Sequence, residues 1–532
     1  MTQQTKKRVL MIGLDGYDPE LAERLMHEGK LPNLQGLIKR SASFPLDHGI
    51  YRYTGLAGEH IASGQSPDLS GRWSAVEFDP DRYVASQPDT SIPPFINSLE
   101  SRTVIFDAPY FDLARSSRSC GIVGWGAHDP GIQLQSEPPE LLEEINQRFG
   151  RYEAEKFIYA FTWPSMERTQ RAGESLCRGA AQRTNIIEWL LKERLPDWEL
   201  AYVVWSEFHS IIEPMWHGVD SSHPLHEHAT AELSGQMVTR LYQAVDEGIG
   251  RLAREFPDAS IVMFSMHGMG PNHGDVPSMA LLPEFIYRQQ TGNTVLHVPD
   301  SWRKMPVPML EAGESWEKYV IASLHHPQAS LLDRIRLRLK RIRKHGNRTR
   351  SLNWMPANHY QRYWREMKAF ALPSFYDGRI RINLKGREKY GKVDPHDYEK
   401  VCEQIKADLL KCTNPLTGAQ AVGEVVYRPL PAALNANRTE SDILVFWRET
   451  ILGIDHPQFG SIGPLPLRRT GGHTGGHGAA YILDETIQPG NYAVQSSFNV
   501  IPTVFHLFGL AKPENISGTS LLQTNPNALK KH

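Results

Sequence analysis

Residues 9–18, VLMIGLDGYD, decide how the rest of the chain can fold. The stretch is a short apolar run that ends in a glycine-containing turn, a pattern typical of a buried strand in a parallel sheet. Open α/β sheets place their ligand sites at the carboxyl ends of such strands, and Asp15 stands at that end here. Taken alone, Asp15 could equally cap a following helix, so the other strand ends have to be considered with it.

Two later apolar runs also end in side chains that can bind metals. The run LAYVVW, residues 200–205, is followed by Glu207 and His209, and the run SIVMFS, residues 260–265, leads to His267. Helices are predicted between these runs, so the order of elements predicts a doubly wound, mostly parallel α/β sheet flanked by helices. Because the carboxyl ends of parallel strands meet at one edge, we expect these side chains to lie close together.

Composition restricts the class of protein. The chain has 532 residues, 40% of them hydrophobic, and a formal net charge of −2, which gives no basis for binding a nucleic-acid polymer. Its four cysteines show no CxxC spacing, which suits free thiols in a reducing compartment. The N-terminal apolar run leads directly into the Asp15 motif, and no apolar run is long enough to span a membrane. We therefore expect a cytoplasmic protein.

Residues 49–64, GIYRYTGLAGEHIASG, predict a loop that runs into a helix, with Thr54 in the loop just before it. A hydroxyl near a helix N-terminus faces unpaired N–H groups and the positive end of the helix dipole, an environment that favours an anion. The alternative for an isolated threonine is a plain N-cap.

The second half of the chain contains two basic stretches. Residues 331–350, LLDRIRLRLKRIRKHGNRTR, predict a basic amphipathic helix. It could contact an acidic partner, a membrane surface or a polyanionic substrate, or, as we favour, be a solvated helix face. The alternation in residues 378–384, GRIRINL, predicts an antiparallel strand. Its Arg379 and Arg381, together with Arg387, could clamp phosphate oxygens or form an exposed strand face.

A glycine-rich loop, residues 468–478 with the sequence RRTGGHTGGHG, carries His473 and His477 near the end of the chain. Together these features suggest a core interrupted by an insertion. We expect the following division: 1–290, the first part of the α/β core; 291–368, a cap-like insertion with the basic helix; 369–523, the remainder of the core with the His473 loop; 524–532, a frayed tail.

Taken in order, these motifs resemble the alkaline phosphatase superfamily, and within it the type I phosphodiesterase / nucleotide pyrophosphatase branch. The resemblance rests on five motifs in the expected order: LMIGLDG ending at Asp15, Thr54 before Ser63-Gly64, Glu207 with His209, SMHGM with His267, and Gly471-Gly472-His473. The closing segment NVIPTVFHLFGLAKPENISGTSLL is also similar to the end of that family. Each motif is weak alone, and the ordered set covers both ends of the chain.

The resemblance implies an alkaline phosphatase-like fold and a metal-dependent phosphohydrolase, a phosphodiesterase or nucleotide pyrophosphatase that acts through a phosphorylated Thr54. It also implies one or two divalent ions, zinc or manganese, and a small phosphate ester or anhydride as substrate. The implied ligands are Asp15, Thr54 and His267 for one ion, and Glu207 and His473, with His209 as a further candidate, for the other. No oligomeric state is indicated.

The sequence departs from the family pattern at two positions. Met266 stands where the family has an aspartate, and Ile211 stands where a histidine is expected four residues after Glu207. A thioether is a poor ligand for a hard or borderline cation. His209 or Glu213 would have to replace the missing histidine, and His273 or Asp275 the missing aspartate.

These departures keep three functions open. The first is the phosphohydrolase. The second is a phospho-group transferase or mutase on the same fold, with an alcohol other than water as acceptor. The third is a non-catalytic binding protein with a degraded metal site, which Met266 favours. A sulfatase is disfavoured because the CxPxR pattern is absent.

Overall fold

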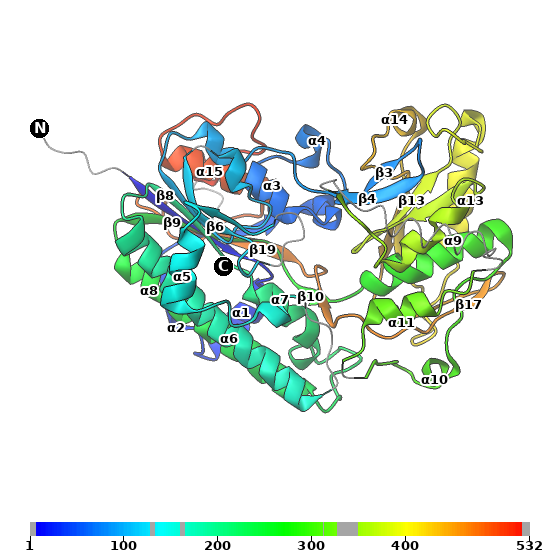
Figure 1. The fold of residues 1–532 in the computed structure, drawn as a ribbon, viewed down its shortest axis with the longest axis horizontal. Coiled ribbons are helices and arrows are strands. Elements are labelled where there is room, and N and C mark those ends of the chain that lie inside the picture. The colour runs from blue at the N-terminus through cyan, green and yellow to red at the C-terminus, as the bar shows by residue number, and fades with distance from the viewer. Residues whose placement is uncertain are drawn as a thin grey trace, which may run out of the picture. The chain divides into compact units, whose positions relative to one another are not determined.

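The computed structural model describes residues 7–116, 118–127, 133–159, 165–311, 313–326 and 349–523 (Figure 1). Contacts within the chain divide it into two compact units. Unit 1 comprises Met1–Gly71, Thr90–Asn272 and Arg469–His532. Unit 2 comprises Arg72–Asp89 and His273–Arg468.

A ten-stranded sheet forms the centre of unit 1, in the order β20-β2-β19-β9-β1-β8-β5-β6-β7, with β21 also beside β2. Its middle is parallel: β1 (Arg8–Leu14) lies between β8 (Leu200–Trp205) and β9 (Ala259–His267). The parallel order continues from β8 to β5 (Thr103–Phe106) and β6 (Ser119–Val123). The predicted doubly wound, mostly parallel sheet is therefore confirmed.

One antiparallel strand inside this sheet brings the glycine-rich loop to the carboxyl edge. Strand β19 (His477–Leu483) runs antiparallel both to β9 and to β2 (Ala42–Asp47). Because β19 begins where β9 ends, the register pairs His477 with His267. The loop before β19 and the segment after β2 consequently lie at the same edge as the ends of β1, β8 and β9. The sheet is completed by β7 (Gln135–Glu137), β20 (Gly490–Asn491) and β21 (Gln495–Ser496).

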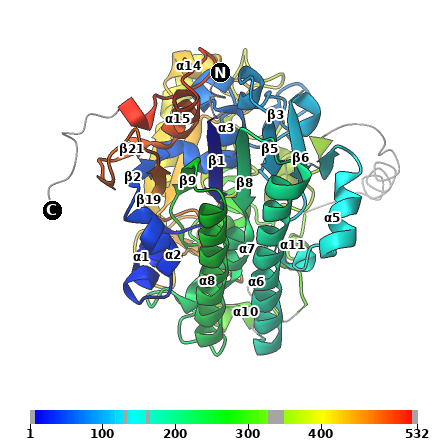
Figure 2. The same cartoon turned by 90° about the vertical axis from the view of Figure 1, so that its left-hand side faces the viewer.

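Two long helices cover one face of the sheet. Helices α6 (Met166–Trp189) and α8 (Ala231–Glu255) lie side by side in Figure 2. Helix α8 forms because its apolar residues recur every three or four positions and face the core, as at Val238, Leu241, Val245, Ile249 and Leu252. The other helices of unit 1 are α1 (Pro19–His27), α2 (Pro32–Ile38), α3 (Ala57–Ser63), α4 (Pro67–Ser70), α5 (Leu141–Phe149), α7 (Glu207–Met215) and α15 (Val500–Leu507).

Unit 2 is built around a four-stranded antiparallel sheet, in the order β12-β13-β15-β14. The antiparallel strand predicted in GRIRINL is β13 (Gly378–Ile382), which pairs with β12 (Ala369–Leu372) and β15 (Ile443–Trp447). The other strands are β3 (Glu77–Asp79), β4 (Val84–Pro88), β11 (Thr349–Arg350), β14 (Val422–Tyr427), β16 (Ile454–His456) and β17 (Gly460–Ile462). The helices are α9 (Leu282–Thr291), α10 (Asp300–Arg303), α11 (Trp316–Ala322), α13 (Tyr398–Leu409) and α14 (Leu430–Leu434).

The contacts divide the chain at positions that differ from the expected insertion 291–368. Residues 369–468, which we expected in the core, belong to unit 2, and so does the early segment Arg72–Asp89. That segment joins unit 2 through partners far along the chain, for example the N–H of Phe78, which donates to the carbonyl of Arg438. The role of the insertion as a cap stays a prediction.

Two expected segments cannot be compared with the structure. The predicted basic helix lies almost entirely outside the described residues, and so does the predicted frayed tail 524–532. Among the described residues, no helix combines the length and the apolar character that a membrane crossing needs.

Candidate active site

Asp15 follows β1 in a tight turn that is joined to the end of β8 and the start of α7. Its N–H donates to the carbonyl of Trp205 at 3.1 Å, and its carbonyl accepts from the N–H of His209 at 2.9 Å. Gly16 has φ of +82°, and a Cβ there would lie 2.5 Å from the backbone of His209. Only glycine allows this close approach without strain, so the glycine after Asp15 sets the position of His209.

His209 lies between two carboxylates and a second histidine. Its Nδ1–H donates to Asp15 Oδ2 at 3.2 Å, and its Nε2 lies 3.2 Å from Glu213 Oε1. His473 approaches from the glycine-rich loop, with its Nε2 3.1 Å from the Nε2 of His209. His209 and Glu213 share one face of α7 because residues four apart in a helix are neighbours.

The three side chains fit a divalent metal ion. The ligand atoms of His209, Glu213 and His473 all lie within 4.8 Å of one another. Four ligands at zinc–nitrogen bond lengths would stand about 3.3 Å apart around a tetrahedron, close to the two spacings of His209 Nε2. Nitrogen and carboxylate donors suit zinc or manganese. Asp15 accepts from the other ring nitrogen of His209, which is the usual way a ligating histidine is oriented.

The electrostatic surroundings of this group are set by buried charges. Burial lowers the pKa of His209, but the charges and hydrogen bonds of Asp15 and Glu213 outweigh it and raise the pKa to about 10. Arg469 forms a very short ion pair with Glu213 Oε1, and the N–H of Thr470 donates to the Glu213 carbonyl at 2.7 Å. The glutamate is thereby fixed at both its side chain and its backbone.

His267 lies next to this group, at the end of β9. Its ring meets the ring of His473 edge to face, with centroids 4.7 Å apart. Its Nδ1–H donates to the carbonyl of Gly268 at 3.2 Å, which leaves Nε2 as the unprotonated nitrogen. Burial lowers the pKa of His267 to about 4, so the ring is neutral at physiological pH.

A cavity of about 60 Å³ adjoins Asp15 and His267. Met266 forms part of its wall, beside Tyr202 and Phe264. An apolar side chain thus occupies the position where the family pattern expects a carboxylate.

Thr54 belongs to a segment that reaches this cavity. It ends a short 3-10 turn, Gly49–Thr54, and is 5% exposed. Its hydroxyl donates to the carbonyl of Tyr51 at 2.8 Å and accepts from the N–H of Leu56 at 3.2 Å. Ala57 and Gly58, at the start of α3, line the cavity together with Asp15 and His267. Among the described residues that line the cavity, Ala57 is the nearest to Thr54 along the chain, three positions after it.

The structure does not bring Glu207 to the cluster of His209, Glu213 and His473, which we call the His209 group. Arg183 Nε donates to both of its carboxylate oxygens, at 2.9 and 3.0 Å, and the Tyr152 hydroxyl donates at 3.0 Å. Arg183 also pairs with Asp107 at 2.7 Å, and the side chains of Glu207, Arg183 and Asp107 are 0% exposed. Glu207 thus lies in a buried network of ion pairs, and the carboxylate that lies beside His209 is that of Glu213.

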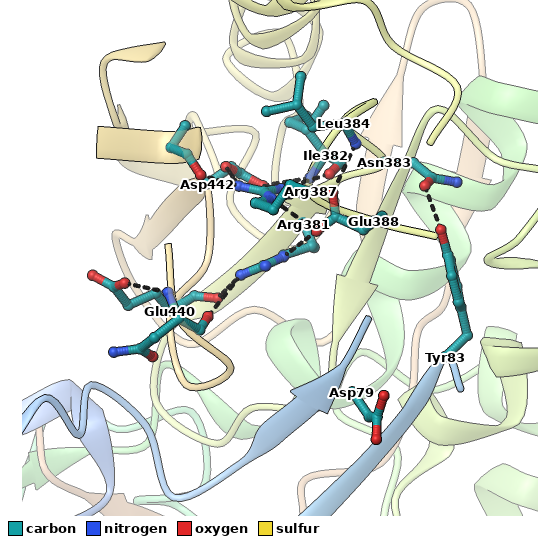
Figure 3. A network of polar contacts seen from close by, with 12 residues as sticks. Asp79, Tyr83, Arg381, Ile382, Asn383, Leu384, Arg387, Glu388, Glu440 and Asp442 are labelled. Atoms are coloured by element: carbon teal, nitrogen blue, oxygen red, sulfur yellow. Dashed lines mark hydrogen bonds and ion pairs between the residues drawn. The ribbon is translucent and has the colours of Figure 1, made fainter. Parts of the chain in front are cut away.

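The three arginines expected to clamp phosphate are also held by internal partners, and Figure 3 shows two of them, Arg381 and Arg387. Arg381 donates to Glu388 at 2.8 Å and to the carbonyls of Asn437 and Glu440. Arg387 makes two bonds of 2.6 Å to Asp442, and Arg379 donates to Asp377 at 3.0 Å. These contacts favour a structural role inside unit 2 over a phosphate clamp.

We expect Arg381→Lys to lower the free energy of unfolding by about 1–3 kcal/mol and to leave the KM for substrate unchanged. Lysine keeps the charge but cannot serve Glu388 and two carbonyls with one ammonium group. Denaturant unfolding and steady-state kinetics on the same preparation measure both effects. Arg365→Lys is the control, since Arg365 donates to a single carbonyl at the surface. A raised KM with unchanged stability would return Arg381 to the substrate site.

The suggested substitute ligands His273 and Asp275 both belong to unit 2. Asp275 Oδ2 accepts from Arg468 NH1 at 2.6 Å, a buried ion pair within that unit. The sequence contained no signal for this pairing, because the two residues are far apart in the chain. Replacement of the missing aspartate by either residue stays a prediction.

Comparison with family models matches residues 9–450 of the chain to the family described as type I phosphodiesterase / nucleotide pyrophosphatase. A comparison with curated proteins finds no match.

Comparison with solved structures concerns the fold. The chain is similar to wild-type alkaline phosphatase PafA at 10% identity, over 97% of this chain and 98% of that one, with a TM-score of 0.51. It is also similar to phosphonoacetate hydrolase from Sinorhizobium meliloti 1021, at 12% identity over 95% and 96% of the two chains, with a TM-score of 0.47. Murine ectonucleotide pyrophosphatase / phosphodiesterase 5 gives 12% identity over 96% and 97%, with a TM-score of 0.46. The similarity to PafA agrees with an alkaline phosphatase-like α/β fold.

Proposed function

Because the chain belongs to the type I phosphodiesterase / nucleotide pyrophosphatase family, a family of phosphoester hydrolases, we propose that it cleaves a small phosphodiester or pyrophosphate through a phosphorylated Thr54 with the help of a divalent ion. The observation that carries the proposal is the convergence of His209, Glu213 and His473 at the carboxyl edge of the sheet.

The residues that would hold the ion are themselves held in place. Asp15 accepts the Nδ1 proton of His209 and so turns Nε2 toward Glu213 and His473. Arg469 fixes the carboxylate of Glu213 through Oε1, the same oxygen that faces His209. When bound, a divalent ion supplies a Lewis acid that polarises a phosphoryl oxygen.

Thr54 supplies the nucleophile in this proposal. Its Oγ1 forms a bond to phosphorus as the bond from phosphorus to the leaving oxygen breaks, and the threonine proton passes to a base. We assign His267 as this base, because its Nε2 is unprotonated and the ring lines the same cavity as Ala57 and Gly58, which follow Thr54 in the chain. Water then attacks the phosphothreonine, which releases the phosphate product and restores the hydroxyl.

The proposal predicts that removal of metal abolishes hydrolysis and that zinc or manganese restores it. The experiment strips the purified chain with a chelator, reloads it with either ion, and follows both metal content and release of nitrophenol from an activated phosphodiester. Protein that binds neither ion and never hydrolyses the diester would contradict the proposal and favour the non-catalytic alternative. Adding an alcohol to the assay distinguishes a hydrolase from a phospho-group transferase, since a transferase would form a new phosphate ester in place of free phosphate.

A further inference from the structure

We propose that Arg52 binds the phosphoryl group of the substrate and takes the place of a second metal ion, so that this chain works with one divalent ion and one arginine. The inference rests on the proposed function, since it concerns the same site. It starts from the side chains that a second ion would require.

Among the ligands expected for a second ion, one is missing and two already have hydrogen-bond partners, while His267 serves as the base in the proposed function. Asp15 Oδ2 accepts from His209, and Thr54 Oγ1 donates to the carbonyl of Tyr51. Met266 brings a thioether to the wall of the cavity in place of a carboxylate. Within the described residues, the three-ligand group that converges is His209, Glu213 and His473, which accounts for one ion.

Arg52 is held in a fixed position between the two functional loops. It lies in the same 3-10 turn as Thr54, two residues before it. Its NH1 donates to the carbonyl of Gly475 at 2.9 Å, in the loop that carries His473. Its NH2 donates to the Tyr53 hydroxyl at 2.8 Å, and the guanidinium lies 4.8 Å from the centre of the Tyr53 ring. The guanidinium of Arg52 therefore connects the turn that carries Thr54 to the loop that carries His473.

The charge of Arg52 has no carboxylate partner in the described part of the chain. The other arginines of the site and its surroundings are paired, Arg469 with Glu213 and Arg183 with Glu207 and Asp107. Arg52 Nε is buried and has no hydrogen-bond partner among the described residues. A buried donor without an acceptor costs free energy, and a phosphoryl oxygen is the acceptor that guanidinium groups bind most strongly.

Arg52 is linked to the cavity through the loop that carries His473. Its NH1 donates to the carbonyl of Gly475, and the ring of His473 lies against the ring of His267 with centroids 4.7 Å apart. His267 lines the cavity together with Asp15 and Met266. The guanidinium is therefore joined by one short loop to the residues beside which the phosphoryl group would bind.

The charges of the site suit one divalent ion together with an anionic substrate. The carboxylates of Asp15 and Glu213 offset the guanidinium groups of Arg52 and Arg469. One divalent ion then leaves an excess of positive charge that matches an anionic phosphoryl group. A second ion would add further positive charge, and Met266 supplies no carboxylate against it.

The experiment compares Arg52→Gln with the control Arg8→Gln in zinc-loaded protein. Arg8 has the same kinds of partner, since it donates to the carbonyl of Pro196 at 2.8 Å and lies 5.0 Å from the Trp198 ring, but it stands at the amino end of β1. Metal analysis gives the number of ions per chain, and calorimetry gives the Kd of inorganic phosphate. We expect Arg52→Gln to raise this Kd and the KM at least about tenfold, with one ion per chain retained. Arg8→Gln leaves all three values unchanged, and Arg52→Lys recovers part of the loss.

Each of the following results would overturn one part of the proposal. Phosphate affinity and KM within about twofold of wild type in Arg52→Gln would remove Arg52 from phosphate binding. Two ions per chain in the wild type would overturn its role as a replacement. Arg52-dependent phosphate binding without any hydrolysis by the wild type would overturn the proposed function and leave Arg52 as a phosphate ligand. If Arg52→Gln does not fold, the same criteria apply to Arg52→Met, which also removes the charge.

Discussion

We expect Thr54→Ala to abolish turnover: kcat/KM for an activated phosphodiester should fall at least about 10³-fold while the fold is retained. The reason is that the covalent step needs the Thr54 oxygen, whereas within the described residues this oxygen makes two short-range bonds, to Tyr51 and Leu56. Loss of a hydroxyl with such local partners costs about 1 kcal/mol of stability. Kinetics, metal analysis and thermal unfolding of the same preparation measure the three quantities.

Ser63→Ala is the matched control for this variant. Ser63 also donates to a carbonyl in the preceding turn, that of Glu59 at 2.7 Å, and accepts from an N–H two residues on, at 3.2 Å. Its removal should cost similar stability and leave turnover unchanged. Thr54→Ser keeps a hydroxyl and should retain measurable activity. Wild-type turnover by Thr54→Ala would exclude a phosphothreonine intermediate.

The second prediction separates two glutamates of the same helix. Glu213→Ala should lower the affinity for zinc at least about 100-fold and abolish hydrolysis, because it removes a ligand from the His209 group. Glu207→Ala should keep the metal but lower the free energy of unfolding by about 3–5 kcal/mol, because it leaves the charge of Arg183 buried with only part of its counter-charge. Competition with a metal-binding dye and denaturant unfolding measure the two effects.

Each glutamate is the control for the other, since both lie in α7 and neither is more than 2% exposed. If Glu207→Ala loses the metal and Glu213→Ala keeps it, the ligand set implied by the sequence motif is correct and the structural assignment fails. If both variants keep the metal, the His209 group is not the metal site.

The sequence by itself determined the sheet and its functional edge. Short buried runs such as those before Asp15 and Glu207 form parallel strands, and parallel strands end at one edge, so the convergence of His209 and His473 with Asp15 followed from local patterns. The antiparallel strand formed by GRIRINL could also be predicted from the local sequence, because the alternation of side-chain types that indicates it lies in consecutive residues. The ordered motifs were also sufficient to predict the family, and the match over residues 9–450 confirms this prediction.

Only the tertiary structure decided which charged side chains are available at that edge. Helix α7 begins at Glu207, so Glu207 points about 200° away from His209 around the helix axis, while Glu213 lies one turn further on the same face. The partner of Glu207 is Arg183, on helix α6, and the partners of Arg381 and Arg387 are Glu388 and Asp442. A charge is neutralised by whichever opposite charge packing brings within a few ångströms, and that partner can stand anywhere in the chain. The same reason makes Arg52 informative: its charge meets no carboxylate among the described residues, and only the packed structure shows this.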